Sequence, residues 1–555
     1  MAIQGPVSFE PDPKHRKAML KTAQREHWIH SEHKEMHDLN KRGAFTRVLR
    51  SSLPAGTRVF GSRFHYKIKR KHDMTVDKYK VRLVLQGQHM RQGVDYEHSF
   101  SPVPHASSFR TMLSIATAKD MHIEHIDISQ AFVQADLIEG DKVMYMSPPQ
   151  GYDEDPAYVY KLNVPLYGGK TGSRSWHITM SKFMRDQGFR TVGFEKSLWY
   201  KEVQGEQLLV GAHVDDFAVC GTNRGVIAAF RDILLKRFEG TEAGDLHHYL
   251  GCIVKRDLVA GTTELSQAHY AEHVLREFNM WECKIAKTPM RPDQHLSMQD
   301  CTTGFIDPDF HTQYREITGV LAWLHAMTRP DLGWVCSSLA RFVQYPGQAH
   351  MDAAMHALAY LRFTVDKCII YSRPTSADDV NRLWGWVDAD YAGCPDTRKS
   401  HTGYVLMLNG GAISWKSKRQ GTVSLSSAES EYIAASKCSQ EVMYLREILL
   451  GFNCEQVKPT IVYEDNRACI AMSENQVHRE RSKHIDVRKY FVRDLVEAKV
   501  LKLIPCGTKE MVADALTKSL AYPSFEMHRA EMLGEKFAST RVLVRSGGSF
   551  WFGRG

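Results

Sequence analysis

Two adjacent aspartates, Asp215 and Asp216, lie between two short apolar runs in the segment LLVGAHVDDFAVCG, residues 208–221. Each run is a plausible β-strand, so the pair falls at a predicted hairpin turn. Aspartates are ordinary in turns because they accept hydrogen bonds from nearby backbone amides, and a solvated hairpin is the common explanation. Two hard oxygen ligands at a strand end also suit Mg²⁺, which binds carboxylates, water and substrate phosphates. A magnesium site would need a third carboxylate and a basic surface for a polyanion.

Asp127 is the candidate for that third carboxylate. It lies between two isoleucines in a predicted strand of MHIEHIDISQAFVQADL, and Phe132 follows five residues later. A single aspartate in a strand is usually an edge residue. Together with Asp215 and Asp216 it would provide three carboxylates around two metal ions about 3.5–4 Å apart, the arrangement used for phosphoryl transfer.

The basic surface is predicted upstream of these aspartates. Residues 58–91, RVFGSRFHYKIKRKHDMTVDKYKVRLVLQGQHMR, interleave many cations with strand-forming residues, a pattern typical of a sheet that faces phosphates. An exposed polar face without a ligand is the alternative. The whole chain has 72 Lys and Arg against 64 Asp and Glu, a net charge of +8 that is too small to demonstrate a nucleic-acid partner by itself.

Four further acids fall at element ends or on buried faces in the C-terminal part. Asp388 lies in the predicted strand LWGWVDADYA, Asp465 closes the strand PTIVYED, and Asp514 lies in the final predicted helix. The long helix between them offers Glu429 and Glu431. At about 100° per residue, Glu431 shares a stripe with the apolar residues that must face the sheet, whereas Glu429 points about 200° away. A buried carboxylate is costly unless it is paired or binds metal, so Glu431 is the functional candidate and Glu429 a capping residue.

The elements that must position these acids divide the chain into several units. A length of 555 residues is too great for one core, and a hydrophobic content of 43% is that of a folded protein. The fold class expected is α+β or α/β, with several domains. We expect a leader at residues 1–43, a unit of alternating strands and helices at 44–290, and a helical spacer at 291–380. A mixed sheet with helices, in the order β-β-β-α-β-α-α-β-α, is expected at 381–520, and a loose tail at 521–555.

Two local signals support the elements of the fourth unit. Asn409 and Gly410 suit a tight turn with positive φ between two strands. Ser426 and Glu429 form a predicted capping box that opens the long helix.

The compartment is indicated by cysteine usage and by the absence of targeting patterns in the sequence. The 11 cysteines are scattered without the spacing of zinc sites, so we expect free thiols and no structural zinc. The N-terminal residues have no apolar signal core, and no apolar run reaches about 18 residues. We therefore expect an intracellular protein with neither secretion nor a membrane span.

Several blocks of the sequence resemble the Pol polyprotein of copia-type LTR retrotransposons. IDISQAF and AHVDDFAVCG, with YKVRLVLQGQHMRQGVDYEHSFSPV before them and LYGGKTGSRSW between, resemble its reverse transcriptase. The blocks GWVDADYAGCPDTRKSHTGYVLMLNGGAISWKSKRQGTVSLSSAESEYIA, VYEDNRACI, RSKHIDVRKYFVRD and VADALTKSL are similar to its ribonuclease H domain. The gag, protease and integrase parts have no counterpart, so we expect a fragment of a longer polyprotein or a separate reading frame derived from an element.

The resemblance implies a fold and an activity. The fold would be a right-hand polymerase of fingers, palm and thumb, followed by a helical connection and a ribonuclease H-like domain, over the ranges given above. The activity would be RNA-directed DNA synthesis with degradation of the RNA strand of the hybrid. Two Mg²⁺ ions would serve each active site, with Mn²⁺ as a substitute.

The resemblance also implies roles for single residues. Asp127, Asp215 and Asp216 match the polymerase triad that holds the two metal ions. The nucleotide contacts match Lys67, Lys80, Arg82, Phe132 and Thr171. Here Phe132 is the aromatic gate against a ribose 2′-hydroxyl, and Lys80 and Arg82 are equal candidates for the triphosphate. The segment that supports the primer end matches His213, Tyr249, Leu250 and Gly251. The ribonuclease tetrad, which activates water, matches Asp388, Glu431, Asp465 and Asp514.

The chain departs from the family pattern at two places. His213 stands where the family usually has Tyr. The block YGGKTGSRSWH stands where the family has YGLKQAPRAWY, with Thr171 in place of a Gln that contacts the nucleotide. Two alternatives to a working enzyme therefore stay open: a decayed or domesticated element that only binds nucleic acid, and a ribonuclease H with an inactive polymerase.

The expected partners are an RNA template, a DNA primer, the RNA–DNA hybrid, deoxynucleoside triphosphates and other parts of the polyprotein. No membrane partner is expected, and the oligomeric state stays open. The expected location is the cytoplasm, with virus-like particles and the nucleus as alternatives.

Overall fold

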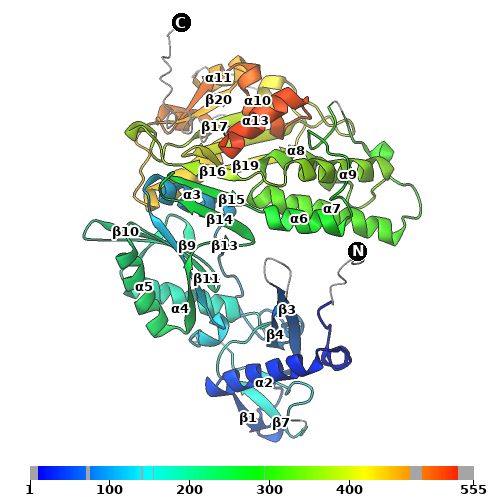
Figure 1. Cartoon of the computed structure of the whole chain (residues 1–555), viewed down its shortest axis with the longest axis vertical. Helices are drawn as coiled ribbons and strands as arrows, with labels where there is room; N and C mark the ends of the chain where they lie inside the picture. Colours follow the sequence, from blue (N-terminus) through cyan, green and yellow to red (C-terminus); the bar gives the residue numbers. More distant parts are fainter. Residues whose placement is uncertain are drawn as a thin grey trace, which may run out of the picture.

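The computed structural model describes residues 11–70, 76–138, 142–153, 155–292, 294–474 and 491–535. Its described strands form five sheets, which follow one another along the long axis of the molecule (Figure 1). The expected class, a chain of several units with mixed helix and sheet, is confirmed at this level. No helix in the described part of the chain is long and apolar enough to cross a bilayer.

The N-terminal region contains a four-stranded sheet, a separate hairpin and the helix that covers the hairpin. The sheet order is β1-β7-β6-β2, and the hairpin pairs β3 with β4. Helix α2 buries Trp28 against Tyr66 and Tyr79 of the hairpin, so the segment expected as a leader is part of this core. The bounds are α1 Arg16–Met19, α2 Arg25–Lys41, β1 Phe45–Leu49, β2 Val59–Phe60, β3 Ser62–Arg70, β4 Val76–Leu85, β6 Tyr145–Met146 and β7 Tyr158–Leu162.

The central sheet has six strands in the order β12-β5-β11-β10-β9-β8. Helix α3 covers one face, where Met112 packs in one core with Leu209. Helices α4 and α5 cover the other face, where Trp176 packs in one core with Val210. The alternation of side chains along β10 therefore separates the two cores. The bounds are α3 Ala106–Ala118, β5 His122–Ile128, α4 Gly172–Asp186, β8 Arg190–Val192, β9 Glu195–Val203, β10 Glu206–His213, β11 Asp216–Gly221, α5 Arg224–Arg237 and β12 Gly240–Asp245.

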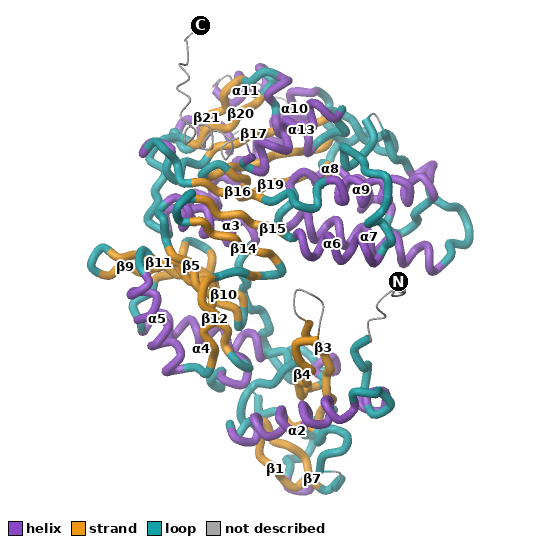
Figure 2. The backbone as a smooth tube through the Cα atoms, viewed as in Figure 1, coloured by secondary structure: helices purple, strands orange, loops and turns teal. Residues whose placement is uncertain are grey.

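A third sheet, β13-β14-β15-β16, joins the central sheet to a group of helices. Figure 2 shows α6, α7, α8 and α9 gathered on one side of the molecule, where they share a hydrophobic core. Helices are expected from the sequence in this stretch, but β16 is not: the chain returns after about a hundred residues to pair β16 with β15. The bounds are β13 His248–Tyr249, β14 Cys252–Asp257, β15 Thr262–Ser266, α6 Ala268–Glu277, α7 Pro308–Met327, α8 Gly333–Leu339, α9 Gln348–Phe363 and β16 Ile369–Ser372.

The C-terminal sheet has the order β19-β18-β17-β20-β21, with the first three strands antiparallel and β20 and β21 parallel to β17. The three expected antiparallel strands are confirmed, as is the turn at Asn409 and Gly410, whose φ values are 49° and 95°. The bounds are β17 Trp384–Asp390, β18 His401–Leu408, β19 Gly411–Arg419, α10 Ser427–Gly451, β20 Thr460–Glu464, α11 Arg467–Glu474, β21 Leu501–Pro505 and α13 Tyr522–Leu533.

Two expectations for the C-terminal region are wrong, and a third falls partly outside the described residues. Asp514 lies in a 3₁₀ segment, Val512–Leu516, and not in an α-helix. Its own N–H donates to the Met511 carbonyl, three residues earlier. Residues 522–533, expected in a loose tail, form helix α13 and bury Phe525. Of the expected helix DVRKYFVRDLVEAK, residues 491–497 are helical and those before 491 lie outside the described residues.

The cap of α10 forms nearly as expected. The Ser426 side chain accepts the Glu429 N–H at 3.2 Å. The Glu429 carboxylate accepts the N–H of Leu425, one residue earlier than in a standard capping box, at 2.7 Å. Glu429 is thus a capping residue, as predicted.

The central and C-terminal sheets are held together through α3. Arg110 is fully buried there and donates to the carbonyls of Ile413, Ala326 and Met327, while its guanidinium lies 3.8 Å from the Trp415 ring. A buried cation without its donors satisfied would be costly, so these contacts fix the two regions against each other.

Candidate functional sites

Asp215 and Asp216 lie at the predicted hairpin turn. His213 pairs with Asp216, which leaves Val214 and Asp215 as the two turn residues. Val214 has φ 62°, a strained conformation for a β-branched residue. The Trp176 indole donates to the Val214 carbonyl at 2.6 Å, and this contact holds the turn in place.

Asp127 joins the pair from the neighbouring strand. It lies directly opposite Asp216 in the pairing of β5 with β11, so the two side chains share one face. Burial and the charges of Asp216 and Asp127 raise the pKa of Asp215. The His125 Nε2 lies 3.3 Å from the Asp216 carboxylate. The structure therefore brings the three predicted aspartates to one end of the central sheet.

The predicted primer segment, which includes Tyr249, Leu250 and Gly251, packs against this hairpin. Leu250 and Gly251, with φ 50° and 75°, form the turn between β13 and β14. Tyr249 is buried, and its hydroxyl donates to the Asp216 carbonyl at 3.3 Å. In this position Tyr249 contacts the backbone of the aspartate hairpin. Contact of this segment and of His213 with a primer stays a prediction.

The cations of the β3–β4 hairpin approach the aspartates from a different sheet. Burial and the charge of Arg82 lower the pKa of Lys80 to about 8, and the negative charge of Asp215 opposes this shift. Asp215 in turn lies within the electrostatic influence of Arg82. Lys67 pairs with Lys80 across the hairpin, but its ammonium lies 2.6 Å from Asp12. Lys80 and Arg82 therefore face the aspartates together.

Aromatic side chains link Arg82 to the predicted gate. The Arg82 guanidinium lies 4.6 Å from the Tyr167 ring, which is 5.2 Å from the Phe132 ring. A Cβ atom on Gly172 would lie 3.5 Å from Phe132. Thr171, only 6% exposed, precedes Gly172 at the start of α4. The predicted nucleotide residues other than Lys67 thus line one region beside the aspartates.

The second site consists of Asp388, Glu431 and Asp465. Their carboxylate oxygens lie within 4.8 Å of one another, and no other His, Cys, Asp or Glu group in the described ranges meets this spacing. Asp388 lies near the end of β17, and Asp465 follows β20. Because these strands are parallel, their carboxyl ends meet at one edge of the sheet. Glu431 lies in the first turns of α10, on the buried stripe predicted from its spacing.

Asp514, the fourth predicted acid, lies beside this group and has a cation of its own. The Lys518 ammonium is 2.7 Å from the Asp514 carboxylate, and the Thr517 hydroxyl donates to Asp388. Burial and the charge of Asp388 raise the pKa of Asp514 to about 7. Burial alone would lower the pKa of Lys518, but the negative charges of Asp388 and Asp514 raise it, so Lys518 offsets part of the charge of both acids.

Burial and crowding of like charge dominate the rest of the cluster. Burial raises the pKa of Glu431, with Glu464 and then Asp388 as the next largest causes. One Glu431 carboxylate oxygen is buried and accepts no hydrogen bond from the described residues. A divalent cation would relieve this repulsion, and three closely spaced carboxylates are the ligands that Mg²⁺ or Mn²⁺ prefers. The residues present therefore fit a metal ion.

Several residues at the two sites were not anticipated from the sequence. They are Glu35, His125, Tyr167, Glu464, Thr517 and Lys518. Glu35 of α2 is buried and accepts hydrogen bonds from the Leu83 N–H and the Gln130 side chain, which ties the N-terminal helix to the loop before Phe132. Only Glu464 carried a usable signal, because a glutamate in the otherwise apolar strand TIVYE is unusual.

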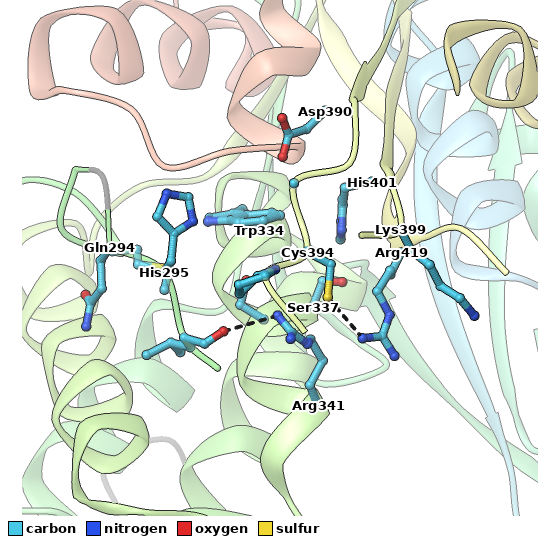
Figure 3. A pocket seen from close by; sticks show the side chains of 15 residues that line it. Gln294, His295, Trp334, Ser337, Arg341, Asp390, Cys394, Lys399, His401 and Arg419 are labelled. Carbon is cyan, nitrogen blue, oxygen red and sulfur yellow. Dashed lines mark hydrogen bonds between the residues drawn. The ribbon is translucent and has the colours of Figure 1, made fainter. Parts of the chain in front are cut away.

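A basic pocket lies next to the second site, between α8 and the connection from β17 to β18 (Figure 3). Asp390, two residues after Asp388, lies at its edge. Arg341, Lys399 and Arg419 line it. Arg341 forms an ion pair with Asp396, and Arg419 donates to the Cys394 sulfur at 3.5 Å. Cations next to an acidic cluster suit a ligand that carries several phosphates.

The chain is similar to one known protein family and to several known proteins. Residues 47–292 match the family model described as reverse transcriptase (RNA-dependent DNA polymerase). The chain is 33% identical over 533 residues to the retrovirus-related Pol polyprotein from transposon TNT 1-94 of Nicotiana tabacum, which covers 95% of this chain and 39% of the relative. The chain is 32% identical over 475 residues to the retrovirus-related Pol polyprotein from transposon RE1 of Arabidopsis thaliana, a match that covers 85% of this chain and 31% of the relative. The transposon Ty1-DR5 Gag-Pol polyprotein of Saccharomyces cerevisiae is 23% identical over 523 residues, covering 91% and 29%. The chain thus spans two fifths or less of the length of these relatives.

Proposed function

The chain belongs to the retrovirus-related Pol polyproteins of copia-type transposons, and we propose that it is an RNA-directed DNA polymerase with ribonuclease H activity. The observation that carries this proposal is the presence of two separate carboxylate clusters. One lies at the β10–β11 hairpin, inside the residues that match the reverse transcriptase family. The other lies at the ends of β17 and β20. Each cluster suits metal-assisted phosphoryl transfer.

The proposed domains follow from this assignment. The β3–β4 hairpin with its cations would belong to the fingers, the central sheet to the palm, and β13, β14, β15 and α6 to the thumb, while β16 lies in the connection. Helices α7 to α9 would form the connection, and the C-terminal sheet the ribonuclease H-like domain. We keep the ranges 44–290, 291–380 and 381–520 for the polymerase, the connection and the ribonuclease. The expected leader, residues 1–43, contributes α2 to the fingers core.

In the proposed polymerase site, Asp127, Asp215 and Asp216 would hold divalent metal. When bound, Mg²⁺ lowers the pKa of the primer 3′-hydroxyl and neutralises triphosphate charge. Lys80 and Arg82 attract the triphosphate, and Tyr167 orients the Arg82 guanidinium by stacking. The Phe132 ring, supported by Tyr167, limits the space for a ribose 2′-hydroxyl.

In the proposed ribonuclease site, Asp388, Glu431, Asp465 and Asp514 would hold the metal. When bound, the metal activates water. Thr517 fixes the Asp388 carboxylate by its hydrogen bond, and Lys518 fixes Asp514. The cations of the neighbouring pocket would attract the hybrid backbone.

The proposed substrates and partners are an RNA template, a DNA primer, deoxynucleoside triphosphates, the hybrid and other parts of the polyprotein. The proposed location is the cytoplasm, including virus-like particles, or the nucleus.

A ribonuclease H with an inactive polymerase is the second candidate. Two observations favour it: only the second cluster has three carboxylates within 4.8 Å among the described residues, and the short Thr171 side chain is buried where the family has a longer amide.

One experiment separates these candidates. The full chain is given a DNA primer on a labelled RNA template with deoxynucleotides, with and without Mg²⁺. The proposed function requires Mg²⁺-dependent primer extension and Mg²⁺-dependent cleavage of the hybrid RNA. Cleavage without extension would establish the second candidate, and binding without either reaction would identify a relic.

A further inference from the structure

Trp176 of α4 contacts the aspartate hairpin, although it is none of the residues to which the proposed mechanism gives a role. Only 3% of the residue is exposed, and its ring lies edge-on to the Phe238 ring at 5.2 Å. The indole N–H donates to the Val214 carbonyl at 2.6 Å. Trp176 therefore has a fixed place in the core, and its one polar group is directed at the turn that carries Asp215.

The Val214 turn is strained and needs a contact from outside the hairpin to keep its shape. His213 pairs with Asp216, so Val214 and Asp215 form a two-residue turn. Val214 has φ 62°, which a β-branched residue rarely adopts. Gly is the residue preferred in a two-residue turn with positive φ at its first position. The hydrogen bond from Trp176 offsets part of this strain, and without it the turn would relax and move Asp215.

The same face of α4 also reaches the predicted gate. Gly172 lies four residues before Trp176, so the two residues share one face of the helix. A Cβ atom on Gly172 would lie 3.5 Å from the Phe132 ring. The Phe132 and Val214 side chains both pack against the hydrophobic cluster that contains Trp176. The first turns of α4 thus fix the place of the aspartate turn relative to the Phe132 gate.

We propose that Trp176 is a positioning residue for DNA synthesis, which holds the Val214 turn so that Asp215 keeps its place beside the nucleotide site at Phe132. The inference rests on the proposed polymerase function of the central sheet. Catalysis depends on precise placement of the catalytic groups, so a displaced turn slows the chemical step. Nucleotide binding should change little, because Lys80 and Arg82, which attract the triphosphate, belong to the separate β3–β4 hairpin.

The first test compares Trp176→Phe with the unaltered full chain. Phe keeps an aromatic ring in the core and removes the N–H, so the Val214 carbonyl loses this donor. We expect kcat for primer extension on an RNA template with Mg²⁺ to fall roughly tenfold, which is the cost of one lost hydrogen bond at a strained turn. The KM for deoxynucleotide should stay nearly unchanged. Hybrid cleavage should not change, because the second site lies in another sheet.

Trp199→Phe is the matched control. Trp199 lies in the same hydrophobic cluster and is 1% exposed, and its indole nitrogen has no hydrogen-bond partner among the described residues. The two substitutions remove the same atoms from one core, so both variants should lose a similar amount of thermal stability. Only Trp176→Phe should lose most of its kcat. An equal loss of kcat in both variants would mean that Trp176 acts through core packing alone, and the proposal would be wrong.

Val214→Gly tests the strain directly. Gly adopts positive φ without a steric cost, so the turn should depend less on the hydrogen bond from Trp176. In the Val214→Gly background, Trp176→Phe should therefore lower kcat only about twofold instead of tenfold. Equal losses in the two backgrounds would overturn the role of Trp176 in holding a strained turn.

Amide hydrogen exchange separates this inference from the proposed function. Exchange in residues 208–221 should be faster in Trp176→Phe than in Trp199→Phe, because the turn opens more often. If this difference is found but the unaltered chain does not extend a primer, the polymerase function fails and the link from Trp176 to the turn stands. If the unaltered chain extends primers and Trp176→Phe does so at the same rate, the role of Trp176 is wrong and the polymerase function stands.

Discussion

The two acidic sites hold their carboxylates in different ways. At the central sheet, the Asp216 side chain is 37% exposed and contacts His125, and the opposing cations come from a separate hairpin. At the C-terminal sheet, Asp388 and Glu431 are almost fully buried, and the nearby Lys518 forms its ion pair with Asp514. The first site therefore balances its charge across a space between two sheets, whereas the second concentrates like charge inside one unit.

The two sites also differ in backbone conformation. The first site depends on a strained turn residue, Val214, held by a single indole hydrogen bond. The second uses parallel strand ends and a helix start, which are unstrained. A site that admits a nucleotide and a template must stay open, so its balancing cations have to come from a separate part of the fold. A site that binds only metal and one phosphodiester can hold its carboxylates close together. The stability of the folded protein then depends on whether metal is bound.

The largest expected effect is the separation of the two activities. Asp215→Asn should reduce primer extension roughly 100-fold or more and leave hybrid cleavage unchanged, because each site holds its own catalytic metal. Asp388→Asn should do the reverse. Both activities are measured on one preparation. Loss of both from either change, in a folded protein, would contradict two independent sites.

The second largest expected effect concerns the cations of the β3–β4 hairpin. Replacing Lys80 and Arg82 together by Gln should raise the KM for deoxynucleotide roughly 30-fold, because two charge-assisted contacts to the triphosphate are lost. Affinity for primer-template should change much less, and hybrid cleavage should not change. Lys67→Gln is the matched control, since Lys67 already pairs with Asp12. A change in duplex affinity alone would assign these residues to the nucleic-acid backbone.

The pH dependence of stability should distinguish the buried cluster. The pKa of Asp514 is raised to about 7, and that of Glu431 is raised as well. The folded state then holds protons that the unfolded state has released, so this contribution is complete below about pH 4 and is lost as pH rises to about 7. Without metal, the melting temperature should fall over this range, and Mg²⁺ should reduce the fall. Without metal, the melting temperature of Asp514→Asn should fall less over this range than that of the unaltered chain, which would assign the effect to this cluster. The same pH dependence in both proteins would contradict it.

The smallest effect concerns Thr171. A Gln there could restore one hydrogen bond to the incoming nucleotide, a contact of about 1 kcal/mol. Thr171→Gln should therefore raise kcat/KM for deoxynucleotides several-fold without affecting hybrid cleavage. Thr171→Ser is the control for altered bulk at this buried position. If the polymerase stays inactive in every variant while cleavage persists, the ribonuclease-only candidate is correct.

Much of the second site was predictable because helical and strand periodicities are local. The spacing of apolar residues around Glu431 was enough to choose it over Glu429, and the structure buries the one and uses the other as a cap. The hairpin at Asp215 and Asp216 and the turn at Asn409 and Gly410 likewise follow from short-range rules.

The sequence by itself determined which acids share an element and a face, since alternation and helical spacing depend only on near neighbours. Only the tertiary structure decided which charges meet. It brought Asp12 to Lys67, Lys518 to Asp514, and Lys80 close enough to Asp215 for their charges to interact. It also left Glu464 buried without a cation among the described residues, although Asp465, the next residue, was recognisable as a ligand. The reason is that electrostatic balance depends on distances between segments remote in the chain, and no local pattern records them.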